Sequence, residues 1–235
     1  MIELVDMCSL QDPDKVDFRK MKDSGVRGVW LKSSQYSGSR DPTFRIGHQR
    51  AMEAGLDCGA YHFAYCGKSA RAQMQFAYQS CMGLGSAKGE LPFMLDWEYA
   101  ENGEDGKLIS EEDTVKWLVE AADEANRLWG GKVIIYTYPD FSRQHQPYLA
   151  SSGVGKYDLC LAAYPNIRTL PEPWNKVTVH QYAGNDGRVP GVAVPCDRDR
   201  FLGTELEYQG FLGYDITKPV EEVSGGTIHV GGYGS

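Results

Sequence analysis

The sequence lacks the features of a secreted or membrane-spanning chain. It has no long apolar run and no positively charged start, and Asp6, Asp12 and Asp14 interrupt its first segment. A membrane-spanning helix needs about 20 mostly apolar residues, and a secretory signal needs a basic start followed by an apolar stretch. We therefore expect no signal peptide, no membrane insertion and synthesis in the cytoplasm.

Clusters of basic residues are also missing. The 235 residues include 24 Lys and Arg against 32 Asp and Glu, which gives a formal net charge of −8. Nucleic acids and anionic membranes attract basic surfaces, so this balance disfavours both as partners. The length and the 42% hydrophobic content suffice for one large domain with a sizeable core.

Cysteine occurs without the spacing of a metal site. The six cysteines are Cys8, Cys58, Cys66, Cys81, Cys160 and Cys196. A structural zinc site usually contains Cys-x-x-Cys pairs, and none is present. Most of the cysteines lie in apolar segments, where a thiol serves as a small core residue. We expect free thiols in a reducing cytosol, and neither a metal nor a cofactor.

One stretch, residues 91–99, predicts a buried strand that ends in two acids. Its apolar run at 93–95 is typical of a strand covered on both faces, and Asp96 and Glu98 follow it. Because the two acids are two residues apart on a strand, they lie on the same face. Their mutual repulsion should raise the pKa of one of them. A protonated acid beside a carboxylate is what glycoside hydrolysis requires. Ordinary solvated acids at an exposed strand end are the alternative.

Strand and helix patterns alternate along the chain. The predicted strands cover residues 2–5, 26–31, 56–63, 91–99, 132–136, 157–164, 177–182 and 195–201, and the clearest helix runs from Ser110 to Trp129. Such alternation indicates a parallel sheet, and about eight strands favour a closed barrel. The last three strands lack full helices between them. We therefore predict the α/β class, with one catalytic domain forming an irregular TIM-like (β/α)5(β)3 barrel. A doubly wound open sheet is the alternative, but no Gly-x-Gly-x-x-Gly follows the first strand.

Polar residues gather where the predicted strands end. In barrels of this type the chemistry lies at the carboxyl ends of the strands. The residues there are Asp6, Lys32, His62, Asp96, Glu98, Tyr136, Tyr164, Gln181, Tyr182 and Asp197. Aromatic faces among carboxylates suit a sugar substrate, which favours the functional interpretation of the two acids.

Several of these residues also allow a structural interpretation. A lone histidine such as His62 is more often a hydrogen-bonded wall residue than a base or ligand. Lys32 could form a purely structural ion pair, and each tyrosine could pack in the core. Asp199 competes with Asp197 for a catalytic position, and the spacing to Phe201 favours Asp197.

The residues resemble glycoside hydrolase family 25, the lysozymes or muramidases common among phage endolysins. The resemblance covers roughly residues 1–203 and has its parts in the family's order. The similar segments are Val-Asp-Met-Cys at 5–8 with Gln11, residues 16–26, Asp41 with Phe44, Ala-Gly-Leu at 54–56, Gly-Ala-Tyr-His-Phe at 59–63, Leu-Asp-Trp-Glu at 95–98, Val-Ile-Ile-Tyr-Thr at 133–137, Gln-Tyr at 181–182 and Asp-Arg-Asp-Arg-Phe at 197–201.

This resemblance implies cleavage of the β-1,4 bond between N-acetylmuramic acid and N-acetylglucosamine in peptidoglycan. It makes Glu98 the general acid and Asp96 its paired carboxylate, with Asp6 and Asp197 completing the catalytic cluster. The substrate-binding residues would be Lys32, Tyr61, His62, Tyr136, Tyr164, Gln181 and Tyr182. The nucleophile stays open between the substrate's N-acetyl group, assisted by Asp96, and a carboxylate that attacks directly.

The sequence departs from the family in two places. Residues 33–36 are Ser-Ser-Gln-Tyr where the family usually has Ala-Thr-Glu-Gly, and Cys8 replaces a serine. A family 18 chitinase is an alternative, because Asp-Trp-Glu-Tyr at 96–99 resembles its motif. That family expects further Asp residues at the positions of Met94 and Leu91. A catalytically inactive module that binds wall glycans is the second alternative.

Beyond the barrel we expect two further segments. Residues 204–223 would form a C-terminal extension, and the Gly-rich residues 224–235 a linker or tail. A wall-binding module could follow this linker in the full protein. Without a signal peptide, release to the wall would need a holin pore, as the resemblance to phage endolysins implies.

Overall fold

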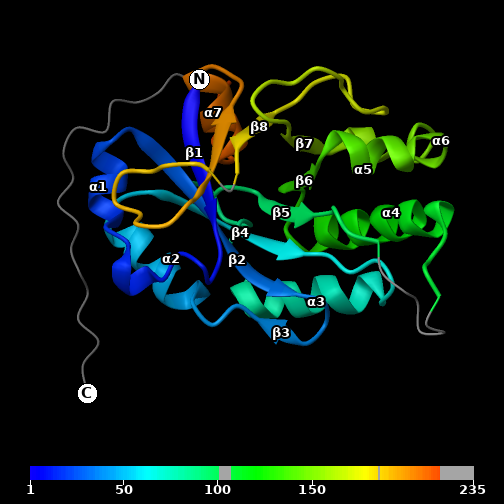
Figure 1. Ribbon diagram of the computed structural model, residues 1–235, viewed down its shortest axis with the longest axis horizontal. Coiled ribbons are helices and arrows are strands. Elements are labelled where there is room, and N and C mark those ends of the chain that lie inside the picture. The colour runs from blue at the N-terminus through cyan, green and yellow to red at the C-terminus, as the bar shows by residue number, and fades with distance from the viewer. Residues whose placement is uncertain (101–106, 185, 218–235) are drawn as a thin grey trace.

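Eight strands close into a barrel in the computed structural model, which describes residues 1–100, 107–184 and 186–217 (Figure 1). The strand order is β1-β9-β8-β7-β6-β5-β4-β2, and pairing of β2 with β1 closes the ring. The short β3 pairs with β2 outside the ring. The strands are β1 (Ile2–Met7), β2 (Val26–Gln35), β3 (Ser39–Arg40), β4 (Asp57–Phe63), β5 (Phe93–Asp96), β6 (Val133–Thr137), β7 (Asp158–Ala162), β8 (Val179–Ala183) and β9 (Asp197–Phe201). The predicted irregular TIM-like barrel is confirmed.

The helices lie outside the barrel, and most of them follow a strand (Figure 1). They are α1 (Phe18–Asp23), α2 (Phe44–Glu53), α3 (Ala70–Cys81), α4 (Glu111–Leu128), α5 (Pro139–Gln144), α6 (Gln146–Leu149) and α7 (Glu205–Phe211), with 3-10 turns at η1 (Pro13–Lys15) and η2 (Val154–Lys156). Ser110 caps the longest helix by accepting a hydrogen bond from the backbone of Asp113 at 3.0 Å. Among the described residues, no helix joins β7 to β8 or β8 to β9, as predicted.

Two apolar cores hold these layers together. One fills the space between the barrel and its helices and includes Phe93, Trp97 and Trp129. The other fills the barrel interior and includes Trp30 and Met94. The described cysteines form no disulfide. No helix in the described part of the chain is long and apolar enough to cross a membrane.

The helix α7 packs against the interior core. Its Tyr208 is fully buried, lies edge-on to Phe201, and donates a hydrogen bond from its hydroxyl to Asp57 Oδ2 at 2.9 Å. This contact links the segment after residue 203 to the barrel. The proposed division at residue 203 stays a prediction, and the predicted tail at 224–235 lies outside the described residues.

The last strand departs from the parallel arrangement that the alternation of strands and helices indicates. β9 runs antiparallel to both neighbours, β1 and β8. A parallel strand would need a crossover connection back to the other end of the barrel, whereas a loop suffices for an antiparallel one. As a result Asp197, the first residue of β9, lies opposite Asp6 near the end of β1. The reversed strand therefore brings Asp197 to the end of the barrel where the other strands finish.

Candidate active site

The predicted acids meet in a cavity of about 190 Å³ at this end of the barrel. The residues that line it are Asp6, Lys32, Tyr61, Phe63, Met94, Asp96, Glu98, Tyr136, Gln181 and Asp197. They come from β1, β2, β4, β5, β6, β8 and β9, and from Glu98 just after β5. The structure thus brings together all four residues that we predicted to be catalytic.

The cavity has a larger hollow on each side. A hollow of about 670 Å³ shares Glu98 and Tyr136 with it, and one of about 300 Å³ shares Asp6, Tyr61 and Asp197. We call these three spaces together the groove. The carboxyl groups lie at its centre, and Tyr164 lines the larger hollow. A chain-like substrate could therefore contact the acids while it extends to both sides.

Strand alternation positions the two central acids. Met94 and Asp96 face the barrel interior, whereas Phe93 and Trp97 pack toward the helices. The strand ends at Asp96, but the backbone N–H of Trp97 still donates to the carbonyl of Tyr136 at 2.9 Å. This bond holds the chain beside β6 past the strand end. Glu98 therefore falls on the same side as Asp96, as the two-residue spacing predicted.

Burial and mutual charge keep these acids protonated at higher pH than usual. Burial raises the pKa of Asp96 well above its usual range, and the charge of Glu98 raises it further. Asp96 Oδ1 has no hydrogen-bond partner among the described residues. Burial also raises the pKa of Glu98, and the charge of Asp197 adds to this effect. The predicted raised pKa is confirmed, and it applies to both acids.

A buried glutamine connects Asp6 with two tyrosines. Gln181 donates from Nε2 to Asp6 Oδ2 at 2.6 Å. Its Oε1 accepts hydrogen bonds from the hydroxyl of Tyr136 at 3.1 Å and from the hydroxyl of Tyr164. Burial, followed by the charge of Asp197, raises the pKa of Asp6 to about 8. Gln181 thus fixes the orientation of Asp6 and of both aromatic rings at once.

Lys32 lies beside the acids without an ion pair to them. Its Nζ donates to Gln35 Oε1 at 2.8 Å and lies 4.8 Å from the centre of the Phe63 ring. No described carboxylate oxygen is within 4.0 Å of it. Its charge still lowers the pKa of Asp96 and of Glu98, against the effect of burial. Its hydrogen-bond partner belongs to the segment 33–36, where the sequence departs from the family.

His62 does not line the groove, which corrects its assignment as a substrate-binding residue. It is fully buried on the outer side of β4, where its Nδ1 lies 2.9 Å from Ser34 Oγ and its Nε2 lies 3.2 Å from Gln73 Oε1. Burial lowers its pKa to about 4, so the ring is neutral. Its neighbour Tyr61 faces the groove instead. His62 is the hydrogen-bonded wall residue of the alternative interpretation.

Tyr182 also lies outside the groove. Its hydroxyl donates to Glu3 Oε2 at 2.5 Å, and the guanidinium of Arg200 lies 4.0 Å from the centre of its ring. Because successive residues on a strand face opposite sides, Gln181 and Tyr182 cannot both point into the barrel. Tyr182 therefore belongs to the outer face of the barrel.

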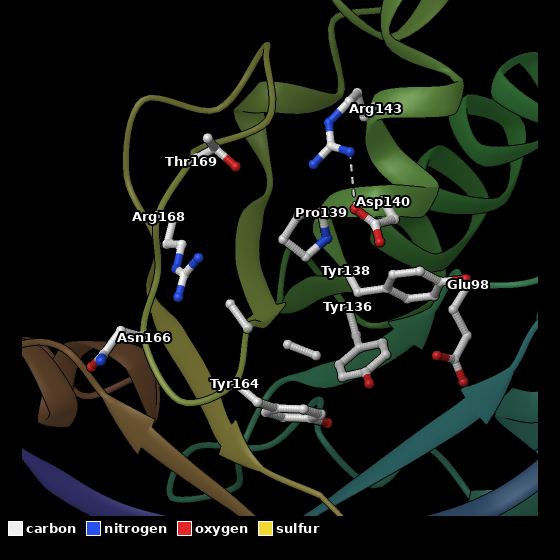
Figure 2. A pocket seen from close by; sticks show the side chains of 12 residues that line it. Glu98, Tyr136, Tyr138, Pro139, Asp140, Arg143, Tyr164, Asn166, Arg168 and Thr169 are labelled. Atoms are coloured by element: carbon white, nitrogen blue, oxygen red, sulfur yellow. Dashed lines mark ion pairs between the residues drawn. The ribbon is translucent and has the colours of Figure 1, made fainter.

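Several residues of the site were not among the predicted ones. Tyr138, Asp140, Arg143, Asn166, Arg168 and Thr169 line the largest hollow (Figure 2). The first three lie at the start of α5 or on it, and the other three lie in the loop after β7, away from the strand ends that marked the predicted site. Asp199 did carry a signal, because it follows Asp197 by two residues on one strand. It is fully buried, and its carboxyl group faces the carboxyl group of Asp6.

Replacing Asp199 with asparagine should stabilise the protein increasingly as the pH rises. Burial, and then the charges of Asp6 and Asp197, raise the pKa of Asp199 well above its usual range. As the pH rises past the ordinary Asp pKa, the unfolded chain loses this proton while the native state keeps it, so native stability falls. Asparagine carries no such penalty. We expect a gain of about 1 kcal/mol at pH 7, or roughly 2–4 °C in melting temperature.

Thermal unfolding of both proteins between pH 4 and pH 8 measures this effect. Asp23→Asn is the matched control, because Asp23 is exposed at the end of α1. A difference between Asp199→Asn and the natural protein that stays constant over this range would contradict the assignment of a neutral Asp199.

Comparison with known proteins identifies relatives that are named as muramidases and lysozymes. The sequence is 29% identical over 126 residues to an N,O-diacetylmuramidase of Arthroderma benhamiae, covering 54% of this chain. The match also covers 54% of that protein, so the chain spans about half the length of this curated relative.

Solved structures share the fold over nearly the whole chain. A muramidase from Trichobolus zukalii has a TM-score of 0.77 at 26% identity and covers 90% of this chain and 99% of that one. A bacterial lysozyme from Streptomyces coelicolor has a TM-score of 0.79 at 22% identity, covering 90% and 96%. The sequence model of glycosyl hydrolases family 25 matches residues 5–192. The chain therefore belongs to glycosyl hydrolase family 25.

Proposed function

We propose that this protein hydrolyses the β-1,4 bond between N-acetylmuramic acid and N-acetylglucosamine in peptidoglycan. The observation that carries this proposal is the pair Asp96 and Glu98 at the centre of the groove, both with raised pKa values. Family membership and the names of the relatives, muramidase and lysozyme, support the same substrate.

Glu98 is the proton donor in this proposal. It lines both the central cavity and the largest hollow, whereas Asp96 lines only the central cavity among these spaces. A general acid must reach the oxygen of the leaving group, and Glu98 has that access. Its raised pKa keeps the proton available at a pH where an ordinary glutamic acid would have lost it.

Asp96 acts on the reacting sugar from within the central cavity in this proposal. Once ionised, its buried carboxyl can accept a hydrogen bond from the substrate or stabilise the positive charge that develops at the anomeric carbon. Two routes remain open for the next step. The substrate's own N-acetyl group attacks with help from Asp96, or a carboxylate attacks directly. Asp6 and Asp197 line the same cavity from β1 and β9, which lie across the barrel from the strand of Asp96.

The tyrosines provide flat surfaces for the glycan. Tyr61, Tyr136 and Tyr164 line the groove, and hydrogen bonds through Gln181 hold the last two in place. The apolar faces of sugar rings can pack on such aromatic rings. We propose that these residues, with Lys32 and Gln181, bind the glycan strand. Neither a metal ion nor a cofactor takes part in the proposed reaction.

The alternatives fit the structure less well. Met94 and Leu91 stand where a family 18 chitinase would have acids, and both are buried in the interior core. A binding module without catalysis would have no need to gather four acids in a cavity, because burial makes each carboxylate costly to ionise. A binding module also leaves the raised pKa values of the central pair without a role.

Incubation with purified, insoluble peptidoglycan tests the proposal. We expect new reducing ends to accumulate in the soluble fraction in proportion to the amount of enzyme. An inactive binding module would co-sediment with the wall but release no reducing ends, and that result would contradict the proposed function. Parallel incubation with chitin separates the chitinase alternative, which predicts release from chitin instead.

We also propose a phage setting, on the strength of the resemblance to endolysins. In this view the enzyme is made in the cytoplasm, reaches the wall through a holin pore, and acts with a wall-binding module located beyond the segment described. Expression in a bacterial host, with and without a holin, tests this idea. Lysis only with the holin would support it, and equal lysis without the holin would contradict it.

A further inference from the structure

The largest hollow of the groove lies beside the proposed proton donor and is open to solvent. It is bounded by the start of α5 on one side and by the loop between β7 and β8 on the other (Figure 2). Its volume is about 670 Å³, within the usual size range of ligand sites. Glu98 and Tyr136 form its border with the central cavity. A glycan strand bound at Glu98 therefore has part of its length in this hollow.

The charges around this hollow do not cancel when Glu98 is protonated. The charged residues that line it are Glu98, Asp140, Arg143 and Arg168. Asp140 and Arg143 form an ion pair at 3.0 Å, drawn as the dashed line in Figure 2. Arg168 has no carboxylate oxygen within 4.0 Å among the described residues, and it projects from its loop on the side opposite Glu98. A net positive charge therefore remains at one wall of the hollow, although the whole chain carries −8.

We propose that Arg168 forms a subsite for a carboxylate of the peptide stem attached to N-acetylmuramic acid. This inference rests on the proposed function and assigns a substrate class to one side of the groove. The sugars of the glycan strand carry hydroxyl and acetamido groups, and the lactyl carboxyl becomes an amide when the stem is attached. The negative charges nearest the glycan therefore belong to the stem. A guanidinium binds a carboxylate through two parallel N–H donors, which makes arginine well suited to it.

The neighbours of Arg168 fit a peptide as well. Asn166 and Thr169, on the same loop, also line the hollow and carry an amide and a hydroxyl. These groups can pair with peptide N–H and carbonyl groups. Tyr164 lies between this loop and the acids and offers a ring face to the sugar (Figure 2). The arrangement orients the strand so that a peptide-bearing N-acetylmuramic acid lies on the Arg168 side of Glu98.

Two substrates that differ only in charge test the subsite. One is a soluble peptidoglycan tetrasaccharide whose stems carry free carboxylates, and the other is the same compound with every stem carboxylate converted to an amide. The natural protein should cleave the first with a kcat/KM about fivefold higher, as expected for an exposed ion pair. The preference should shrink as salt is added, because salt screens exposed charges.

Arg168→Gln should reduce this preference to about one. Arg45→Gln is the control, because Arg45 is an exposed residue of α2 outside the groove and its loss changes the net charge equally. The control should keep the preference of the natural protein. An Arg168→Gln protein that keeps the same preference, or a natural protein that cleaves both substrates equally, would overturn the subsite and leave the proposed hydrolysis intact. Failure of the natural protein to cleave either substrate would instead contradict the proposed function.

Discussion

Replacing Glu98 with glutamine should lower kcat/KM on peptidoglycan about 1,000-fold while the protein keeps its fold. Positioned acids contribute about 100-fold to 10,000-fold to such reactions, and an amide cannot donate the required proton. Glutamine has nearly the same shape, and Glu98 is only partly buried beside the central cavity, so the barrel should tolerate the change. A loss of this size corresponds to about 4 kcal/mol of transition-state stabilisation.

The pH dependence of activity in the natural protein also tests whether Glu98 donates the proton. Because the donor must be protonated, activity should fall as the pH rises through the raised pKa of Glu98. The native state also holds more protons than the unfolded chain, because the pKa values of Asp6, Asp96 and Asp199 are raised, so thermal stability should fall over a similar range. Activity should therefore be measured only where circular dichroism shows the protein folded.

The matched control for this change is Glu120→Gln. Glu120 is exposed on α4, far along the chain from the groove residues, and the substitution removes the same charge. Reducing ends released per minute from the same peptidoglycan, for all three proteins, give the comparison. If Glu98→Gln retained more than about a tenth of the natural activity, Glu98 would not be the general acid.

Replacing Asp96 with asparagine should be nearly as damaging, with a loss of about 100-fold to 1,000-fold in kcat. Charge aimed at the reacting centre in a buried site usually contributes an effect of this size. Asparagine keeps the shape of the side chain but cannot lose a proton, so it cannot become the carboxylate that the reaction needs. Asp96 serves either route, because it can orient the N-acetyl group for attack or act as the carboxylate that attacks directly.

Asp23→Asn serves as the control here as well, with steady-state kinetics on a soluble peptidoglycan tetrasaccharide as the measurement. We expect KM to change little, because Asp96 lies at the floor of the groove rather than along its walls. A loss of less than about fivefold in kcat would show that Asp96 has a structural role and no catalytic one.

The barrel itself could be predicted because its signals are local. Apolar runs indicated the strands. The acids Asp96 and Glu98, which follow one of these runs, indicated the end of the barrel at which the strands finish. The reversed direction of β9 gave no such signal. The residue pattern of a five-residue strand indicates that a strand forms, but not whether it runs parallel or antiparallel to its neighbours. Its consequence for the site was nevertheless anticipated in part, since Asp197 was placed among the catalytic residues.

The errors at His62 and Tyr182 have a simple physical origin. Each follows a groove residue directly, and strand alternation turns consecutive side chains to opposite faces. Strict use of this rule keeps Tyr61 and Gln181 among the predicted groove residues and removes His62 and Tyr182. It also places Asp199 on the same face of β9 as Asp197. Arg168 lies beyond this kind of reasoning, because its place in the groove depends on how a long loop folds back beside α5.

The most direct test of the account is the identity of the sugar at each newly formed reducing end. Purified peptidoglycan is digested, the soluble products are reduced with borohydride, and the fragments are analysed by mass spectrometry. We expect fragments that end in reduced N-acetylmuramic acid from the natural protein and their near absence with Glu98→Gln. Fragments that end in reduced N-acetylglucosamine would place the cut at the other bond and contradict the proposed specificity.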